Sequence, residues 1–232
     1  MFNIACTADI HAPTYFEDFK NALADLEKID LFLLAGDIIF KGNFNEIDKV
    51  IDEIRKKFNG MIIACFGNEE YEEIREKLME RDIIWLDDDY KIIKLDGMKV
   101  GIIGTTGCLD VPTKWQSKHI PNIKDIYEER IKKIDQLISE LDVDLLIILS
   151  HYSPTYKTIF GEEKFKYKWL ACRKFEKVII ERKPNFWIHG HAHNSKITET
   201  KINTTIVLNV SLPAIKNIKT IKIDEGLRKF LV

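Results

Sequence analysis

Six short apolar runs recur along the chain and predict its strands. They are rich in Ile, Leu and Val, and they cover residues 2–6, 31–35, 61–65, 99–104, 145–149 and 186–189. Four of these runs contain no alternating polar position, which is typical of strands that are buried on both faces. We therefore expect a central sheet that is covered on both sides.

Helical patterns separate several of these runs. Apolar residues recur at the spacing of an amphipathic helix within residues 15–26, 44–58 and 123–141. The alternation of strand and helix predicts a largely parallel or mixed sheet with helices on its faces. Residues 196–200, 204–210 and 218–223 are strand-like with little helix between them, which suggests an antiparallel continuation or a second sheet. The predicted fold is an α/β sandwich of four layers, in which two mixed sheets pack together and are flanked by helices.

The organisation of the chain favours one domain with two long loops. No linker rich in Pro, Gly or Ser divides it, so we expect a single domain over residues 1–232. Residues 105–122 and 152–168 show no clear strand or helix pattern, and we expect both to be loops. Long loops in a compact domain are often functional.

Composition narrows the classes of function. The formal net charge of -2 provides no strong positive field, so nucleic acid is not an expected partner, although a local basic patch would still be compatible with one. No apolar run reaches the length of about 18 residues that a membrane helix needs, and the N-terminus lacks the pattern of a signal peptide. The four cysteines show no C-x-x-C spacing, so a cysteine zinc site is not predicted and a cytoplasmic location is the simplest expectation.

Polar side chains follow five of the apolar runs at the point where each predicted strand ends. Because the carboxyl ends of strands line the ligand crevice of an α/β sheet, these side chains should converge. They are two Asp carboxylates, one Asn amide and four imidazoles: Asp9, His11, Asp37, Asn68, His151, His191 and His193. Oxygen and imidazole ligands suit Mn, Fe, Zn or Ni, and this set is large enough for two ions. The sequence therefore predicts a site for two divalent metal ions.

Each of these motifs has an ordinary structural explanation when it is taken alone. A Gly-Asp pair after a strand is usually a turn, and an isolated buried His is more often a core residue than a ligand. The joint pattern carries the prediction, because five of the six strand ends each supply a metal-ligand type. Gly36, Gly67 and Gly190 precede ligands, and we expect them to let the backbone turn sharply.

The order Asp-x-His, Gly-Asp, Gly-Asn, His and Gly-His-x-His resembles that of the calcineurin-like metallophosphoesterases. The resemblance extends over residues 9–193 and implies a sandwich of two mixed sheets, in agreement with the strand pattern. It also implies two metal-ligand sets that share Asp37: Asp9, His11 and His193 for the first ion, and Asn68, His151 and His191 for the second.

The activity expected from this resemblance is hydrolysis of phosphate esters by a hydroxide that two metal ions activate. The substrate would be a small phosphate ester, most simply a phosphodiester, and the catalytic residues would be Asp37, Asn68, Glu69 and His151. Two alternatives are a metal-binding interaction module with weak catalysis and a nuclease of the same superfamily. The complete ligand set argues against the first, and a length of 232 residues leaves little room for the extra regions of the nuclease branch.

The residue after Asn68 departs from the resemblance. Many relatives have a His there that protonates the leaving group, whereas this chain has Glu69 followed by Glu70. Three explanations stay open: Glu69 acts as the acid, the leaving group needs no acid, or His119 replaces the missing His. The structural alternative is that both glutamates begin a helix at Tyr71, where carboxylates favour the N-terminal dipole.

The two long loops supply candidates for substrate binding. His119 lies in the first loop, and Tyr156 follows the ligand His151 in the second. Together with Glu69 they are the residues that we expect to contact the substrate. The alternative for these loops is internal packing or a contact between two copies of the chain, which would make the protein a homo-oligomer. Asn209 is expected to support a ligand histidine from behind.

Overall fold

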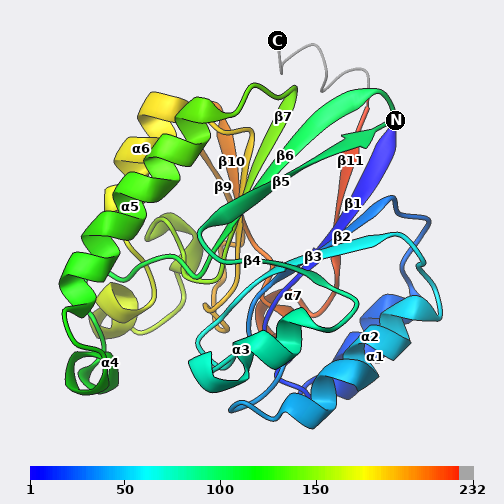
Figure 1. Ribbon diagram of the computed structural model, residues 1–232, viewed down its shortest axis with the longest axis horizontal. Helices are drawn as coiled ribbons and strands as arrows, with labels where there is room; N and C mark the ends of the chain where they lie inside the picture. Colours follow the sequence, from blue (N-terminus) through cyan, green and yellow to red (C-terminus); the bar gives the residue numbers. More distant parts are fainter. Residues whose placement is uncertain (225–232) are drawn as a thin grey trace.

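The computed structural model describes residues 1–224 and contains two mixed sheets (Figure 1). The first sheet has the strand order β11-β1-β2-β3-β4, and the second has the order β5-β6-β7-β8-β10-β9. The predicted α/β sandwich is therefore confirmed. The strands of the first sheet are β1 (Phe2–Thr7), β2 (Leu31–Ala35), β3 (Met61–Cys65), β4 (Ile84–Leu86) and β11 (Lys219–Ile223). Those of the second are β5 (Asp89–Leu95), β6 (Met98–Thr105), β7 (Leu145–Ser150), β8 (Phe186–His189), β9 (Glu199–Ile202) and β10 (Thr205–Asn209).

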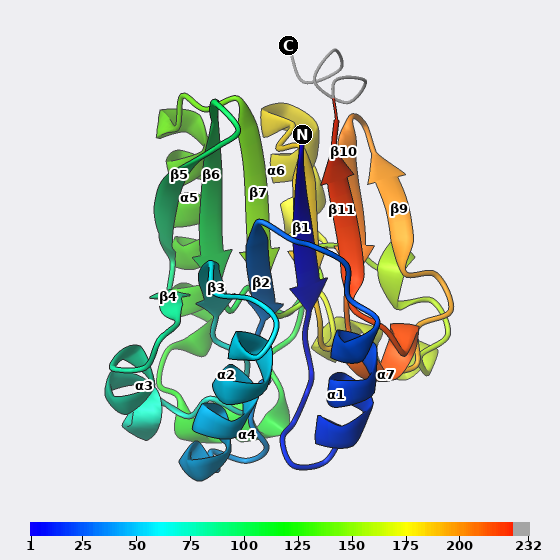
Figure 2. The ribbon, with the colours of Figure 1, turned by 90° about the vertical axis from the view of Figure 1, so that its right-hand side faces the viewer.

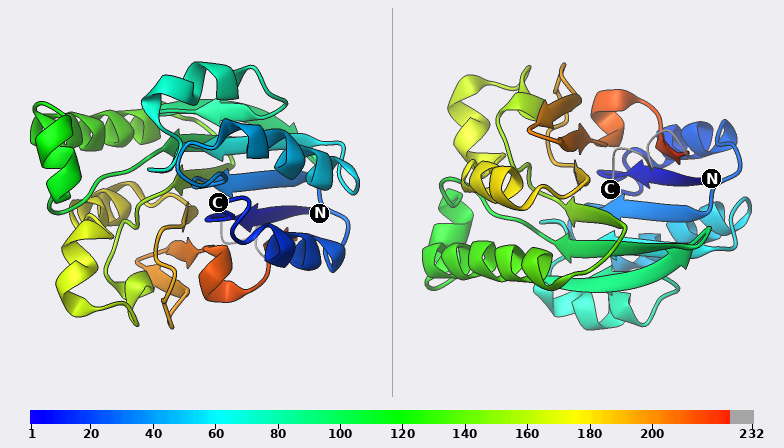
Figure 3. Two further views of the ribbon diagram at one scale, coloured as in Figure 1. Left: turned by 90° about the horizontal axis from the view of Figure 1, so that it is seen from below. Right: turned by 90° about the horizontal axis from the view of Figure 1, so that it is seen from above.

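Helices cover the outer faces of both sheets. They are α1 (Phe16–Ala24), α2 (Ile47–Arg55), α3 (Glu72–Met79), α4 (Lys114–His119), α5 (Ile123–Glu140), α6 (Lys174–Arg182) and α7 (Leu212–Ile215). Three 3-10 helices are η1 (Phe44–Glu46), η2 (Lys157–Ile159) and η3 (Lys164–Trp169). Helices α5 and α6 lie on one side of the molecule, whereas α1 and α2 lie on the other (Figure 3). No helix within residues 1–224 combines the length and apolar character that are needed to cross a membrane.

Three apolar clusters hold the four layers together. The central cluster lies between the sheets, where Ile4 of β1 and Ile147 of β7 are both fully buried. A second cluster packs α1, α2 and α3 against the outer face of the first sheet, and a third packs α5 and α6 against the second. Along β1, Ile4 belongs to the central cluster and Ala5 to the outer one, because successive side chains point to opposite faces. This arrangement explains why the strand runs lack polar positions.

The three predicted helices are present as α1, α2 and α5, but the expected loop at residues 105–122 is only partly a loop. It contains the short helix α4, so that part of the prediction is wrong. The helix begins with a capping box, in which Thr113 Oγ1 accepts the Gln116 N–H and the Gln116 side chain accepts the Thr113 N–H. This pairing satisfies two backbone groups at the helix start. The segment 152–168 likewise contains η2 and most of η3.

The C-terminal strands are divided between the two sheets. Strand β9 pairs antiparallel with β10 as expected, but β10 itself lies parallel to β8. Strand β11 does not join the second sheet. It pairs antiparallel with β1 at the edge of the first sheet. The expected antiparallel pairing is therefore present for β9 and β11, whereas β10 also pairs parallel with β8.

The strand directions bring five carboxyl ends to one edge of the sandwich. Strands β1, β2 and β3 are parallel neighbours in the first sheet, and β7 and β8 are parallel neighbours in the second. The arrowheads of β1, β2, β3 and β7 point to the same end of the molecule in Figure 2. Segments that follow these strands must therefore meet there.

Candidate metal centre

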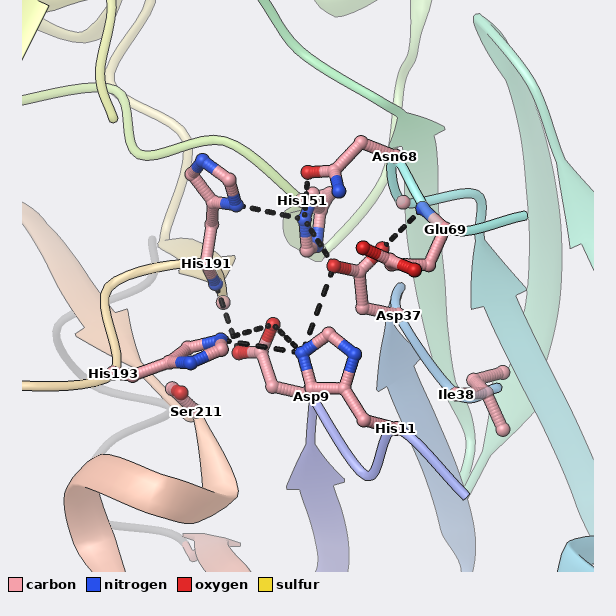
Figure 4. A network of polar contacts seen from close by, with 12 residues as sticks. Asp9, His11, Asp37, Ile38, Asn68, Glu69, His151, His191, His193 and Ser211 are labelled. Atoms are coloured by element: carbon pink, nitrogen blue, oxygen red, sulfur yellow. Dashed lines mark hydrogen bonds and ion pairs between the residues drawn. The ribbon is translucent and has the colours of Figure 1, made fainter. Parts of the chain in front are cut away.

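The seven predicted ligands lie together at the end of the sandwich where these five strands finish (Figure 4). They come from both sheets: Asp9 and His11 after β1, Asp37 after β2, Asn68 after β3, His151 after β7, and His191 and His193 after β8. The structure thus brings together every residue that the strand-end pattern selected. That these residues bind metal stays a prediction.

The ligand atoms form two groups. In each group they lie within 4.8 Å of one another, and the groups are Asp9, His11 and His193, and Asp37, His151 and His191. Asp37 lies between them, because its Oδ2 is 3.7 Å from His11 Nε2 and 3.3 Å from His151 Nε2. A carboxylate in this position could bridge two cations.

The first group contains buried polar atoms that lack a hydrogen-bond partner. Nε2 of His11 lies 3.3 Å from Nε2 of His193, and Nε2 of His193 lies 3.3 Å from Oδ1 of Asp9. Within the described chain, Asp9 Oδ1 and His11 Nδ1 receive no well-directed hydrogen bond, although both are buried. An unpaired buried carboxylate oxygen such as Asp9 Oδ1 is costly. The donor set therefore fits a cation at this position.

The second group directs imidazole nitrogens toward a common point. Nδ1 of His151 lies 3.0 Å from the carbonyl of Ala35, so this nitrogen carries the proton and donates it. Its Nε2 points into the site and lies 3.1 Å from Asn68 Oδ1 and 3.1 Å from His191 Nδ1. Nε2 of His191 lies 3.4 Å from the carbonyl of Trp169, which leaves its Nδ1 unprotonated. Orientation of a ligand imidazole by a backbone carbonyl is typical of metal sites.

Burial and mutual proximity shift the pKa values of these groups. Burial, together with the nearby His151, lowers the pKa of His191 to about 3. Burial also lowers the pKa of His151, but the Asp37 and Asp9 carboxylates outweigh it and raise this pKa to about 9. Burial acts to raise the pKa of both aspartates, yet the surrounding imidazoles hold each below its ordinary value. The site therefore keeps two buried carboxylates ionised, which suits a cation.

The backbone at the ligands is strained. Asp9, His11, Asp37 and His191 have φ values of 58°, 42°, 50° and 68°, in the left-handed region that non-glycine residues avoid. Such conformations cost about 1–3 kcal/mol each and persist where the surroundings over-determine them. Here hydrogen bonds between the ligand loops stabilise these conformations. The His11 N–H donates to the Asp37 carbonyl at 2.9 Å, and the His191 N–H donates to Asp9 Oδ2 at 2.8 Å.

The glycines before the ligands are needed for two different reasons. Gly36 has a φ of +80°, so its turn follows the prediction. Neither Gly67 nor Gly190 has a positive φ, and the expected reason is wrong for both. A Cβ atom at Gly67 would lie 2.2 Å from Asp37 Oδ1, and one at Gly190 would lie 2.7 Å from Asp9 Oδ2. These two glycines make room for carboxylates that come from elsewhere in the chain.

Glu69 and Glu70 occupy different environments, and neither belongs to a helix. Helix α3 begins at Glu72 with Tyr71 before it, so the structural alternative for the two glutamates is wrong. Glu70 is buried and accepts backbone N–H groups beside the site, a role that the sequence reasoning missed. Glu69 is half-buried, and its carboxylate lies within 4.8 Å of ligand atoms of His11 and Asp37.

The other two predicted substrate contacts lie apart from the ligands. His119 is on α4, where its Nδ1 lies 2.8 Å from the Trp115 carbonyl and its ring stacks on that of Trp115. Tyr156 donates its hydroxyl to Asp110 Oδ2 at 2.7 Å. Within the described residues neither side chain contacts a predicted ligand, so their role in substrate binding stays a prediction.

Two side chains support the loop that carries His191 and His193. Nδ2 of Asn209 donates to the carbonyl of Ala192, between the two histidines, at 2.9 Å. Asn209 therefore supports the ligands through the backbone. The sequence reasoning missed Tyr152, whose ring centroid lies 4.7 Å from that of His191. Its position directly after the predicted ligand His151 could have indicated that Tyr152 lies at the site.

Comparison with known proteins agrees with this geometry. The family model described as calcineurin-like phosphoesterase matches residues 2–195. Curated protein sequences provide no significant match. Among solved structures, this chain is similar to phosphopantetheinyl hydrolase from Mycobacterium tuberculosis, with a TM-score of 0.72 and 13% identity over 97% of each chain.

Two further solved structures share the fold at lower similarity. GAP50, the anchor in the inner membrane complex of Plasmodium, has a TM-score of 0.60 and 11% identity over 91% of this chain and 72% of its own. A 5'-nucleotidase precursor from Thermus thermophilus has a TM-score of 0.56 and 16% identity over 96% of this chain and 51% of its own. At such identities the likeness concerns the fold alone, whereas the family model spans most of the sequence. The chain therefore belongs to the calcineurin-like phosphoesterase family.

Proposed function

We propose that this protein is a dinuclear metallophosphoesterase that hydrolyses small phosphodiesters. Its family supports the reaction class, which is metal-dependent hydrolysis of phosphate esters. The observation that carries the dinuclear proposal is the pair of ligand groups that meet at Asp37. Each of the two groups would hold one divalent ion. Their oxygen and nitrogen donors are compatible with Mn, Fe, Zn and Ni.

The chain's own residues would position these ions and the substrate. When bound, a pair of divalent cations polarises phosphoryl oxygens and lowers the pKa of water, so that hydrolysis proceeds near neutral pH. The Glu69 N–H donates to Asp37 Oδ1 at 2.8 Å and thereby orients the carboxylate between the two groups. The Asn68 side chain is exposed, and its Oδ1 lies 3.1 Å from His151 Nε2. No Ser or Cys nucleophile is required.

The preference for a diester rests on the charge of Glu69. A phosphate monoester carries nearly two negative charges at neutral pH, whereas a diester carries one. Because the Glu69 carboxylate lies beside His11 and Asp37, it would repel the monoester more strongly. Many relatives have a His at this position, so the charge at this side of the site differs from theirs.

A substrate panel tests this function. We expect kcat/KM for bis-p-nitrophenyl phosphate to exceed that for p-nitrophenyl phosphate by at least about tenfold, which corresponds to about 1.4 kcal/mol of transition-state stabilisation. Each should be assayed with Mn²⁺, Ni²⁺ or Mg²⁺, beside 2′,3′- and 3′,5′-cyclic nucleotides. An Asp37→Asn variant serves as the control, since it should lose turnover of every substrate.

Two results would contradict the proposal. A monoester preference would remove the diester assignment while leaving the reaction class intact. No turnover of any substrate, with metal ions bound in the measured amounts, would favour the metal-binding interaction module instead.

A further inference from the structure

Glu69 belongs to a third group of potential ligand atoms. Its carboxylate, a ring nitrogen of His11 and an Asp37 oxygen all lie within 4.8 Å of one another. Figure 4 shows the Glu69 side chain directed toward Asp37. The group shares His11 with the first ligand group and Asp37 with the second, so the Glu69 carboxylate lies beside His11, where the first ion would bind.

The loop that follows β2 holds this carboxylate in place. The Lys41 N–H donates to Glu69 Oε2, and the Gly42 N–H donates to the Glu69 carbonyl at 2.9 Å. Lys41 has a φ of 47°, so this contact is made by a strained backbone. Among residues 1–224, no hydrogen bond is donated to the second carboxylate oxygen, Oε1. One oxygen of Glu69 is therefore anchored while the other is free to bind a ligand.

The charge of Glu69 is not balanced by a side-chain cation. The nearest lysine along this loop, Lys41, places its ammonium over the Phe40 ring, 4.8 Å from the centroid. Within the described chain, no Lys or Arg side chain forms an ion pair with Glu69. Three carboxylates, those of Asp9, Asp37 and Glu69, thus lie near His11, and among residues 1–224 no Lys or Arg side chain forms an ion pair with any of them. A divalent cation would offset this concentration of negative charge.

We propose that Glu69 is a direct ligand of the first metal ion. This inference rests on the proposed dinuclear centre. The first ion would then be held by three carboxylates and two imidazoles, from Asp9, His11, Asp37, Glu69 and His193. The second would be held by one carboxylate, one amide and two imidazoles, from Asp37, Asn68, His151 and His191. An oxygen-rich site favours harder cations such as Mn²⁺, so the two positions differ in metal preference.

Calorimetric titration of the metal-free protein with Mn²⁺ tests this assignment. Glu69→Gln keeps an oxygen for the Lys41 N–H but removes the charge, and we expect it to weaken one of two Mn²⁺ sites by about 10- to 100-fold. The other site should stay within about twofold of wild type. Glu73→Gln is the matched control, because Glu73 is exposed at the start of α3 and its change should leave both sites unaltered.

A second variant separates direct ligation from attraction at a distance. Glu69→Asp keeps the charge but shortens the side chain, so a ligand role predicts a weaker first site, whereas a through-space role predicts wild-type affinity. Circular dichroism of both variants confirms that the fold is retained. Wild-type affinity of Glu69→Asp would overturn the proposal.

The same titration distinguishes the two proposals. Two Mn²⁺ sites in wild type and in Glu69→Gln, with equal affinities, would overturn the ligand assignment and leave the dinuclear centre standing. If wild type itself bound fewer than two ions, the dinuclear centre would fail and the ligand assignment with it. Altered dependence on the leaving group with unchanged metal affinity would assign Glu69 to proton transfer instead.

Discussion

Glu70 organises the loop that carries Asp37. Its carboxylate accepts the N–H groups of Gly67 and Asp37 at 2.7 and 2.8 Å, and those of Ile38 and Ile39 at 2.7 and 3.2 Å. A buried carboxylate without such donors would be costly, and buried N–H groups without an acceptor would be costly too. The side chain and the loop therefore satisfy each other, and the bridging position of Asp37 depends on this pairing.

Replacement of Glu70 by glutamine should destabilise the protein. The amide keeps one acceptor oxygen but turns an NH₂ donor toward backbone N–H groups, which leaves at least one of them unsatisfied. We expect the free energy of unfolding of Glu70→Gln to fall by about 1–3 kcal/mol in urea denaturation. Glu76→Gln, at an exposed position of α3, should stay within about 0.5 kcal/mol of wild type. Equal stability of the two variants would show that Glu70 does not support the loop.

At the scale of elements, the loop after β8 depends on its neighbour β10. The strands lie parallel, and Asn209 at the end of β10 reaches the Ala192 carbonyl. Its own Oδ1 accepts the Ser211 N–H at 3.0 Å, so the amide orientation is determined on both sides. His189, the last residue of β8, precedes the same loop, and its Nε2 forms a hydrogen bond of 2.7 Å with Thr158 Oγ1. The positions of His191 and His193 thus follow from a strand that contributes no ligand itself.

Loss of the Asn209 amide should therefore weaken metal binding. We expect Asn209→Ala to lower the affinity for Mn²⁺ by about 10- to 100-fold, as for other residues that orient metal ligands. Elemental analysis after dialysis against a metal buffer would measure the change. Asn217→Ala, in an exposed turn, is the control and should retain wild-type metal content. Full metal content in Asn209→Ala would show that the loop holds its shape without β10.

At the scale of the whole molecule, the candidate centre connects the two sheets. Asp9, Asp37 and Asn68 come from the first sheet, whereas His151 and His191 come from the second. The buried carboxylates of Asp9 and Asp37 each place an oxygen 3.7 Å from His11 Nε2, so their negative charges lie close together. Ions bound here would interact with the folded chain alone, because the ligands are far apart in the sequence.

Removal of metal should consequently lower thermal stability. A ligand that binds only the folded state stabilises it by about 4 kcal/mol at a free concentration of 1,000 times Kd. We expect EDTA to lower Tm measured by scanning calorimetry, and added Mn²⁺ to restore it in proportion to the logarithm of its concentration. The Asp37→Asn variant should respond much less to either addition. An identical Tm with and without metal would mean that no ion binds specifically to the folded protein.

The sequence by itself determined the buried strands and the chemical type of the residues at their ends. Both are local properties, since a run such as residues 145–149 is apolar throughout and His151 follows it directly. The sandwich could be predicted for the same reason, because alternating strands and helices can bury their apolar faces in few ways. Helix α4 was missed because its polar residues show no apolar stripe.

Only the tertiary structure decided which residues meet across the chain. Glu70 acquires its role from an Asp37 loop more than thirty positions earlier, and Gly67 is required because the Asp37 carboxylate fills the space of a side chain. Strand β11 joins the first sheet because β1 has a free edge there, which no local pattern reveals. Such contacts join residues that are distant in sequence, and their energies depend on the assembled layers. The ligand types were therefore visible in the sequence, and so was Glu69 as a candidate site residue, whereas its contact with the Lys41 N–H was not.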